Sequence, residues 1–127
     1  MIVLPDTSAL VELIRGSKAG KVVLEILENS DVVIVPTLVL AELTSFLERN
    51  KIDSSVMDAI AENSLVVVLD REIALSSGKV HSQVKKKNKN VSLADCIISE
   101  TAKRHGAVVL TMDHHFKLLG NAVIIEK

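Results

Sequence analysis

Four acidic residues stand where their carboxylates could act together: Asp6, Glu42, Asp95 and Asp113. If they lie close together, the four carboxylates repel one another and take up protons unless a cation neutralises them, so their convergence implies a bound divalent metal. All-oxygen ligands favour Mg²⁺ or Mn²⁺ over zinc. Such a site activates a water and offsets the charge that builds on phosphate oxygens, which are the needs of phosphodiester hydrolysis.

Each acid also has a structural interpretation when it is taken alone. Ser92 followed three residues later by Asp95 is typical of a capping box at a helix N-terminus. Asp6 and Asp113 suit an N-cap or a turn. Glu42 stands beside the apolar stripe of a predicted helix, where it could bond to a nearby donor. Convergence of all four residues therefore decides between capping and metal binding.

Five short apolar runs, rich in β-branched residues, predict the strands that would position these acids: Ile2 to Leu4, Val32 to Val35, Leu65 to Leu69, Ala107 to Leu110 and Ala122 to Ile125. Runs without alternation predict strands buried on both faces. Helical spacing between them predicts a five-stranded parallel sheet in a three-layer α/β/α sandwich. The strand ends meet at one edge, where open α/β sheets place active sites, and all four acids arise near that edge.

The helical segments can be bounded from their spacing and punctuation. We expect one helix from about Thr7 to Gly16 and a second from Ser17 to Asn29. Two more follow the second strand, from Thr37 to about Asn50 and from Ile52 to Ala61. Asp70 caps a further helix, for which we expect a break near Ser77 and Gly78.

The composition indicates one globular domain over residues 1–127, with 48% hydrophobic residues. The 15 basic and 16 acidic residues nearly balance, so overall charge predicts neither a nucleic-acid nor a membrane partner. Trp and Tyr are absent, which removes common stacking platforms for single strands. Cys96 is the only cysteine, and we interpret it as a small buried hydrophobic residue. With no export signal or spanning segment recognised, we expect a cytoplasmic protein.

The chain resembles the PIN-domain ribonucleases, and within them the VapC-like toxins of toxin–antitoxin pairs. The resemblance covers the whole chain and rests on four motifs in order: Leu4-Pro5-Asp6-Thr7-Ser8, Pro36 to Glu42-Leu43, Ser92-Leu93-Ala94-Asp95, and Thr111-Met112-Asp113. It implies a metal-dependent endoribonuclease with Mg²⁺ or Mn²⁺ held by Asp6, Glu42, Asp95 and Asp113. It also implies that the hydroxyls of Ser8 or Thr111 assist.

The same resemblance implies partners: RNA as the substrate, a second copy of the chain in a homodimer, and a small antitoxin protein. We expect the dimer interface on the helices between Thr37 and Ala61. One departure is visible, because many relatives carry a basic residue where this chain has Met112. That difference puts substrate contacts there in doubt but leaves the metal ligands unaffected.

Several polar features lie outside the acid set. His114 and His115 are adjacent and would point apart on a helix, so we interpret both as surface residues that could touch substrate. His81 and His105 stand near helix ends, where a contact with the helix dipole is expected. The basic run before the Asp95 helix is either a solvated turn or a contact for RNA phosphates, through Lys85, Lys86, Lys87 and Lys89.

Three other functions fit parts of the pattern. A signalling receiver domain also has five parallel strands and an acidic pocket, but it needs adjacent acids after the first strand, where Asp6 stands alone after Pro5. An inactive interaction domain would have no need of all four acids. A PIN nuclease that acts in RNA processing without an antitoxin stays open beside the toxin.

Overall fold

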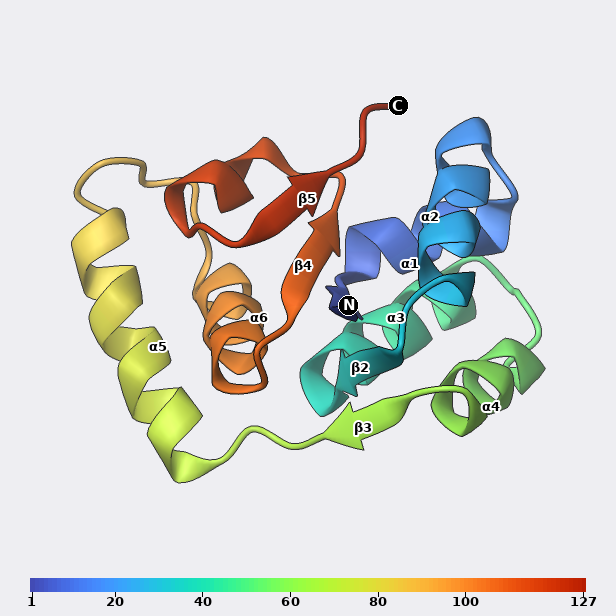
Figure 1. Ribbon diagram of the computed structural model, residues 1–127, viewed down its shortest axis with the longest axis horizontal. Coiled ribbons are helices and arrows are strands. Elements are labelled where there is room, and N and C mark those ends of the chain that lie inside the picture. Colours follow the sequence, from blue (N-terminus) through green and yellow to red (C-terminus); the bar gives the residue numbers. More distant parts are fainter.

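The five strands form one parallel sheet in a computed structural model that describes residues 1–127, in the order β3-β2-β1-β4-β5 (Figure 1). Pairing is in register along the centre, where Val3 faces Val33 on one side and Leu4 faces Val109 on the other. The strands are β1 (Ile2–Pro5), β2 (Val32–Pro36), β3 (Leu65–Val67), β4 (Val108–Thr111) and β5 (Ala122–Ile124). The predicted parallel sheet is confirmed.

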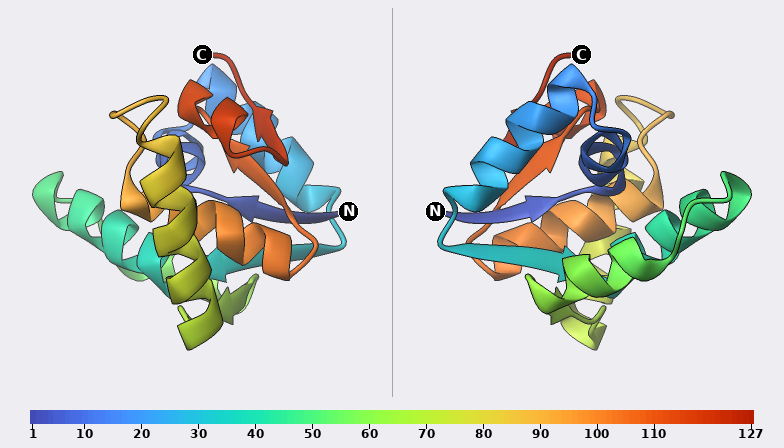
Figure 2. Two further views of the ribbon diagram at one scale, coloured as in Figure 1. Left: turned by 90° about the vertical axis from the view of Figure 1, so that its left-hand side faces the viewer. Right: turned by 90° about the vertical axis from the view of Figure 1, so that its right-hand side faces the viewer.

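Helices cover both faces of this sheet, which confirms the three-layer α/β/α sandwich. They are α1 (Thr7–Arg15), α2 (Lys18–Glu28), α3 (Thr37–Arg49), α4 (Ser55–Glu62), α5 (Arg71–Val84), α6 (Leu93–Arg104) and the 3₁₀ helix η1 (His114–Leu118). In Figure 1, α1, α2 and α4 lie to one side of the strands and α5 and α6 to the other. Figure 2 shows α3 extending beyond the body of the molecule on the side away from the N-terminus.

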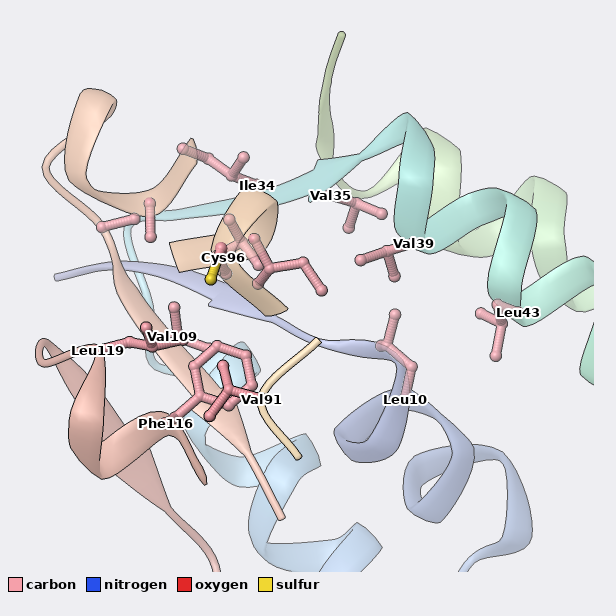
Figure 3. Close-up of a cluster of buried hydrophobic side chains, with 14 residues drawn as sticks. Leu10, Ile34, Val35, Val39, Leu43, Val91, Cys96, Val109, Phe116 and Leu119 are labelled. Carbon is pink, nitrogen blue, oxygen red and sulfur yellow. The ribbon is translucent and has the colours of Figure 1, made fainter. Parts of the chain in front are cut away.

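The main core lies where the central strands meet α6 and η1. Cys96 on α6 and Phe116 on η1 are both 0% exposed, and the Phe116 ring lies beside Val91 and Val109 (Figure 3). Full burial of an aromatic ring of this size is worth a few kcal/mol. Phe116 therefore fixes η1 on the sheet directly after β4, and the interpretation of Cys96 as a buried hydrophobe is confirmed.

The hairpin of α1 and α2 is held together by an unusually close approach at Gly20. A Cβ atom at that position would lie 2.0 Å from the backbone oxygen of Glu12, which no real side chain tolerates. Only glycine allows the second helix to pack this tightly against the first. The hairpin in turn positions the first turn of α1, which carries part of the site described below.

Two helix predictions need correction. The helix expected from Ile52 begins at Ser55, because the Asp53 carboxylate accepts the Ser55 amide at 2.9 Å and starts the turn there. The break expected near Ser77 and Gly78 is absent, since α5 is continuous from Arg71 to Val84. Ser77 bonds back to the Ile73 carbonyl at 2.5 Å within the helix, which satisfies its hydroxyl without interrupting the helix.

The strands are not all buried on both faces. β3 and β5 are the two edges of the sheet, and Leu65 and Val123 are 53% and 42% exposed. Apolar runs therefore predicted the strands but not their places in the sheet. None of the helices has the length and apolar character needed to cross a membrane.

Candidate active site

The centre of the sheet supplies a natural place for a site. Connections from β1 lead towards β2 and those from β4 lead towards β5, so the strand order reverses between β1 and β4. In open α/β sheets the crevice outside the strand ends at such a point is where ligands bind. Asp6 follows β1 directly, and Asp113 comes two residues after Thr111, which ends β4. The Asp6 amide continues the pairing by donating to Leu110 O at 2.9 Å.

Asp6 is buried, with only 5% of its surface exposed, and its carboxylate is held by short hydrogen bonds. Oδ1 accepts from the Ser8 hydroxyl at 2.6 Å and from the Ala9 amide at 3.0 Å, as an N-cap of α1 does. Oδ2 accepts from the Thr111 hydroxyl at 2.5 Å. The carboxylate is thus fixed in orientation by groups from both β4 and α1.

Burial raises the pKa of Asp6 above its ordinary value, because desolvation disfavours the charged form. The hydrogen bonds from Ser8, Thr111 and Ala9 oppose that rise, and the nearby negative charge of Asp95 adds to it. No cationic side chain is among the groups that influence this pKa, and a bound cation nearby would lower it.

Thr111 and Ser8 link the two central strand ends into one network. The Thr111 hydroxyl, which is fully buried, also accepts the Asp113 amide at 2.9 Å, so it ties Asp6 to Asp113. The Ser8 hydroxyl accepts the Met112 amide at 3.0 Å and lies 3.4 Å from the Thr111 hydroxyl. Both hydroxyls thus support Asp6 and the backbone that leads to Asp113.

Asp95 serves as a helix cap and also faces the other acids. Its amide donates to the Ser92 hydroxyl at 3.0 Å, and its Oδ2 accepts the Ser92 amide at 3.3 Å, which completes the expected capping box of α6. Its charge is near enough to raise the pKa of Asp6. The capping interpretation is therefore correct, and it does not exclude a second role for the same carboxylate.

Asp113, His115 and Asp95 form the tightest group of potential ligands. One ligand atom from each lies within 4.8 Å of the others. Asp113 caps η1 by accepting the His115 amide at 2.8 Å, and the His115 ring returns to place Nδ1 3.2 Å from Asp113 Oδ1. All three side chains are half-buried, so their free oxygens and nitrogen stay accessible.

Glu42 stands apart from that group. Its Oε1 accepts the Thr7 hydroxyl at 2.7 Å, which connects it to α1 next to Asp6. With Phe46 and Arg49 it lines a depression of about 570 Å³ between α1 and α3. The structure therefore brings Asp6, Asp95 and Asp113 together around the strand ends, and Glu42 contacts Thr7, the residue that follows Asp6, without belonging to the 4.8 Å group.

The sequence interpretation missed His115. The two histidines do point apart as expected: His114 pairs with Glu126 at 3.0 Å on the surface, whereas His115 turns towards Asp113. In a 3₁₀ helix successive side chains diverge widely, so one of two adjacent residues can face inward. The spacing of two between Asp113 and His115 was the available signal.

Other polar residues lie where they were expected. The His105 Nδ1 contacts the Thr101 carbonyl at 2.9 Å at the C-terminus of α6, and His81 falls in the last turn of α5. Lys85, Lys86, Lys87 and Lys89 are exposed at the end of α5 and in the turn after it. Figure 2 shows that the loop joining α5 to α6 lies on the same side of the molecule as α3.

The donor set fits a divalent cation. Carboxylate oxygens with one imidazole suit ions such as Mn²⁺, and Mg²⁺ accepts such sites through one or two carboxylates and several waters. The Asp6 carboxylate, whose pKa is raised by burial and by the charge of Asp95, would be favoured in its charged form by a nearby cation. The residues that could hold an ion are Asp95, Asp113 and His115, with Asp6 adding charge from beneath.

Comparisons with known proteins agree with this architecture. The family model described as PIN domain matches residues 3–121. No curated protein sequence matches the chain. Among solved structures, a toxin–antitoxin complex from Klebsiella pneumoniae is similar with a TM-score of 0.82, 20% identity and coverage of 98% of this chain and 99% of that one.

Two further structures show the same fold. VapBC-1 from nontypeable Haemophilus influenzae has a TM-score of 0.79 at 20% identity, with 99% of this chain and 98% of that chain covered. Mycobacterium tuberculosis VapC20, described as a sarcin-ricin loop cleaving toxin, has a TM-score of 0.76 at 17% identity, and both chains are covered completely at 100%. At these identities the structures establish a common fold.

Proposed function

Since this chain belongs to the PIN domain family, we propose that it is a metal-dependent endoribonuclease, cleaving single-stranded RNA or unpaired parts of structured RNA, and the toxin of a toxin–antitoxin pair. One observation carries this proposal: ligand atoms of Asp95, Asp113 and His115 gather within 4.8 Å at the strand ends, over the buried Asp6 carboxylate. The description of VapC20 as a sarcin-ricin loop cleaving toxin supports a toxin that cleaves its target.

The proposed mechanism uses the acidic residues to hold a metal ion and a water molecule to attack the phosphate. Asp95 and Asp113 would each supply a carboxylate oxygen as a metal ligand. Glu42, which accepts the Thr7 hydroxyl, adds negative charge nearby. A divalent ion held there would activate a water and offset charge on the phosphate. The hydroxyls of Ser8 and Thr111 donate to the Asp6 carboxylate and hold it in place. We assign the attack on phosphorus to a water activated by the metal, so we expect no covalent enzyme intermediate.

RNA would reach the acids past positive charge, since an acidic cluster by itself repels phosphates. Lys85, Lys86, Lys87 and Lys89 are exposed in and beside the turn that leads into the Asp95 helix. Arg49 lines the depression beside Glu42. We propose that phosphates of the strand contact the lysines as it approaches the site.

Cleavage of a single-stranded RNA by the purified protein tests the function. Activity should require added Mg²⁺ or Mn²⁺ and disappear with chelator. Asp95→Asn keeps the size and the capping geometry but removes the charge, and it should slow cleavage by more than ~100-fold, beyond the usual cost of losing an outer-shell partner.

Asp70→Asn is the matched control for that variant. Asp70 also follows a strand and caps a helix, accepting the Ile73 amide at 2.8 Å, but it has no place in the site. Its variant should cut RNA at the parent rate. Cleavage that persists in chelator, or an Asp95→Asn variant as fast as Asp70→Asn, would overturn the proposal.

The proposed antitoxin partner has a surface that suits it. A groove of about 510 Å³ runs between α1, α2 and α4 and is mainly apolar, with Leu24, Val56 and Ile60 among its 13 lining residues. Several similar structures are toxin–antitoxin complexes, which supports a protein partner. A small reading frame beside this gene, whose product binds the protein and stops RNA cleavage, is the expected finding. Its absence would favour an RNA-processing nuclease.

We also propose a homodimer. The interface expected between Thr37 and Ala61 extends to the adjoining edge of the sheet, because exposed apolar side chains gather there: Leu65, Val66, Val68 and Leu69. Covering such a row protects an edge strand from wrong pairing. Sedimentation at micromolar concentration should give a dimer, and a monomer would exclude it.

A further inference from the structure

His115 is positioned as firmly as the two acids beside it. Asp113, which caps η1, accepts the His115 amide at 2.8 Å, and the next residue, Phe116, is fully buried against the sheet. The ring lies with Nδ1 3.2 Å from Asp113 Oδ1, and about a third of each side chain is exposed, 36% and 37%. The imidazole is therefore held next to Asp113 by the helix η1 that carries it.

The spacing of the three groups suits one shared ion. Ligand atoms bonded to the same ion at about 2.1 Å lie at most ~4.2 Å apart. The ligand atoms of Asp95, Asp113 and His115 already fall within 4.8 Å of one another without an ion. Small side-chain rotations therefore suffice to bring two oxygens and one nitrogen onto one centre.

We infer that His115 is a nitrogen ligand of the metal centre and that it shifts the preference of the centre from Mg²⁺ towards Mn²⁺. This inference rests on the proposed function and specifies its cofactor. Mg²⁺ prefers oxygen ligands and keeps several waters, whereas first-row transition ions gain more from an imidazole nitrogen. The surrounding carboxylates still select a hard ion, and Mn²⁺ is the transition ion that suits carboxylates.

Pulsed electron paramagnetic resonance on the Mn²⁺-loaded protein tests the bond directly, because an imidazole nitrogen on the ion modulates the signal. The parent should show this nitrogen coupling. His115→Asp should lose it while still binding an ion, since it replaces the nitrogen with an oxygen. His114→Ala is the matched control, because His114 is the adjacent residue and pairs with Glu126 on the surface. It should keep the coupling.

Dissociation constants for Mn²⁺ and Mg²⁺, measured by competition on the same proteins, give the second result. The preference for Mn²⁺ over Mg²⁺ should fall at least ~10-fold in His115→Asp and stay within about twofold in His114→Ala. His115→Ala should weaken Mn²⁺ by a similar factor and Mg²⁺ by less. Thermal unfolding of each variant checks that it is folded.

The possible failures are distinguishable. If Mn²⁺ binds the parent without nitrogen coupling, or if His115→Asp keeps the parent preference, the inference about His115 is wrong and the metal-dependent function stands. If neither ion binds the parent at all, the inference and the proposed function fall together.

Discussion

The two halves of the candidate site are built in opposite ways. Around Asp6 the carboxylate is 5% exposed and accepts three hydrogen bonds, from Ser8, Ala9 and Thr111. Around Asp113 the side chains of Asp95 and His115 are half-buried and come from the ends of α6 and η1. We call these the closed half, made of Asp6, Ser8 and Thr111, and the open half, made of Asp95, Asp113 and His115.

The contrast between the two halves shows how several carboxylates can gather in one folded chain. The closed half holds one carboxylate in place with hydrogen bonds from the folded chain. Burial of this carboxylate raises the pKa of Asp6, and the hydrogen bonds oppose that rise. The three side chains of the open half are only half-buried, so an ion could enter and leave. The hydrogen bonds are therefore concentrated in the closed half, and the metal ion would exchange with solvent at the open half.

The largest expected effect comes from cutting the link between the halves with Thr111→Val. The substitution keeps the shape but removes the hydroxyl that donates to Asp6 and accepts from Asp113. A buried carboxylate then loses a partner, so unfolding free energy should fall by ~1–3 kcal/mol. Affinity for Mn²⁺ should fall ~10–100-fold, as when an outer-shell partner is lost. Denaturant unfolding and metal titration measure both.

Thr101→Val is the control for that variant. Thr101 is buried as well, and its hydroxyl bonds to the Ile97 carbonyl at 2.6 Å inside α6, away from the acids. It should alter stability without altering metal affinity. Equal metal affinity in both variants would show that the closed half does not support the open one.

A smaller effect is expected from Asp6→Asn in metal-free protein, and it depends on pH. Because the pKa of Asp6 is raised in the folded state above its ordinary 3.8, folding takes up a proton, and the parent loses stability as pH rises through that window. Asn does not titrate, so the variant should gain in melting temperature relative to the parent as pH rises. Added Mn²⁺ should stabilise the parent more than the variant, because the charge of Asp6 strengthens binding of the ion.

Thermal melts of parent and variant in chelator, from pH 4 to pH 8, measure this difference. A difference in melting temperature that does not change with pH would mean that the pKa of Asp6 is not raised in the folded protein. A parent that Mn²⁺ fails to stabilise would mean that no cation binds near this carboxylate.

The smallest expected effect concerns the approach to the open half. Changing Lys85, Lys86, Lys87 and Lys89 to Gln should reduce the slope of log RNA affinity against log salt by about 0.7 per lysine that contacts a phosphate. Binding is measured on the metal-free Asp95→Asn protein, which should not cut the RNA. Lys18 and Lys21 on α2, changed to Gln together, are the control and should leave the slope unaltered. Equal slopes would assign the lysine run to solubility or to a protein partner.

The strands, the helix caps and the place of Asp6 were predictable from the sequence. Apolar β-branched runs predict the strands, and Asp6 directly after the first run falls at a strand end in any parallel sheet. The capping signals at Ser17, Asp70 and Ser92 were also reliable, because the side chain and the amide it accepts lie three residues apart. These features depend on neighbours in the chain.

The open half could be predicted only in part. That Asp95 and Asp113 lie near one sheet edge follows from topology, but the inward turn of His115 depends on a 3₁₀ helix held by the burial of Phe116. Glu42 was expected with the other acids, yet its bond to Thr7 places it beside them, in the depression between α1 and α3. The contact of Glu42 with Thr7 joins residues 35 apart in the chain, so no local sequence pattern predicts it.

Diffraction from crystals grown with Mn²⁺, recorded for anomalous scattering, tests the central claim most directly, because it locates the ion without relying on activity. We expect one strong anomalous peak at the carboxyl ends of β1 and β4, from an ion bonded to carboxylate oxygens of Asp95 and Asp113. The absence of a peak there at saturating Mn²⁺, or a peak held only by other residues, would contradict it.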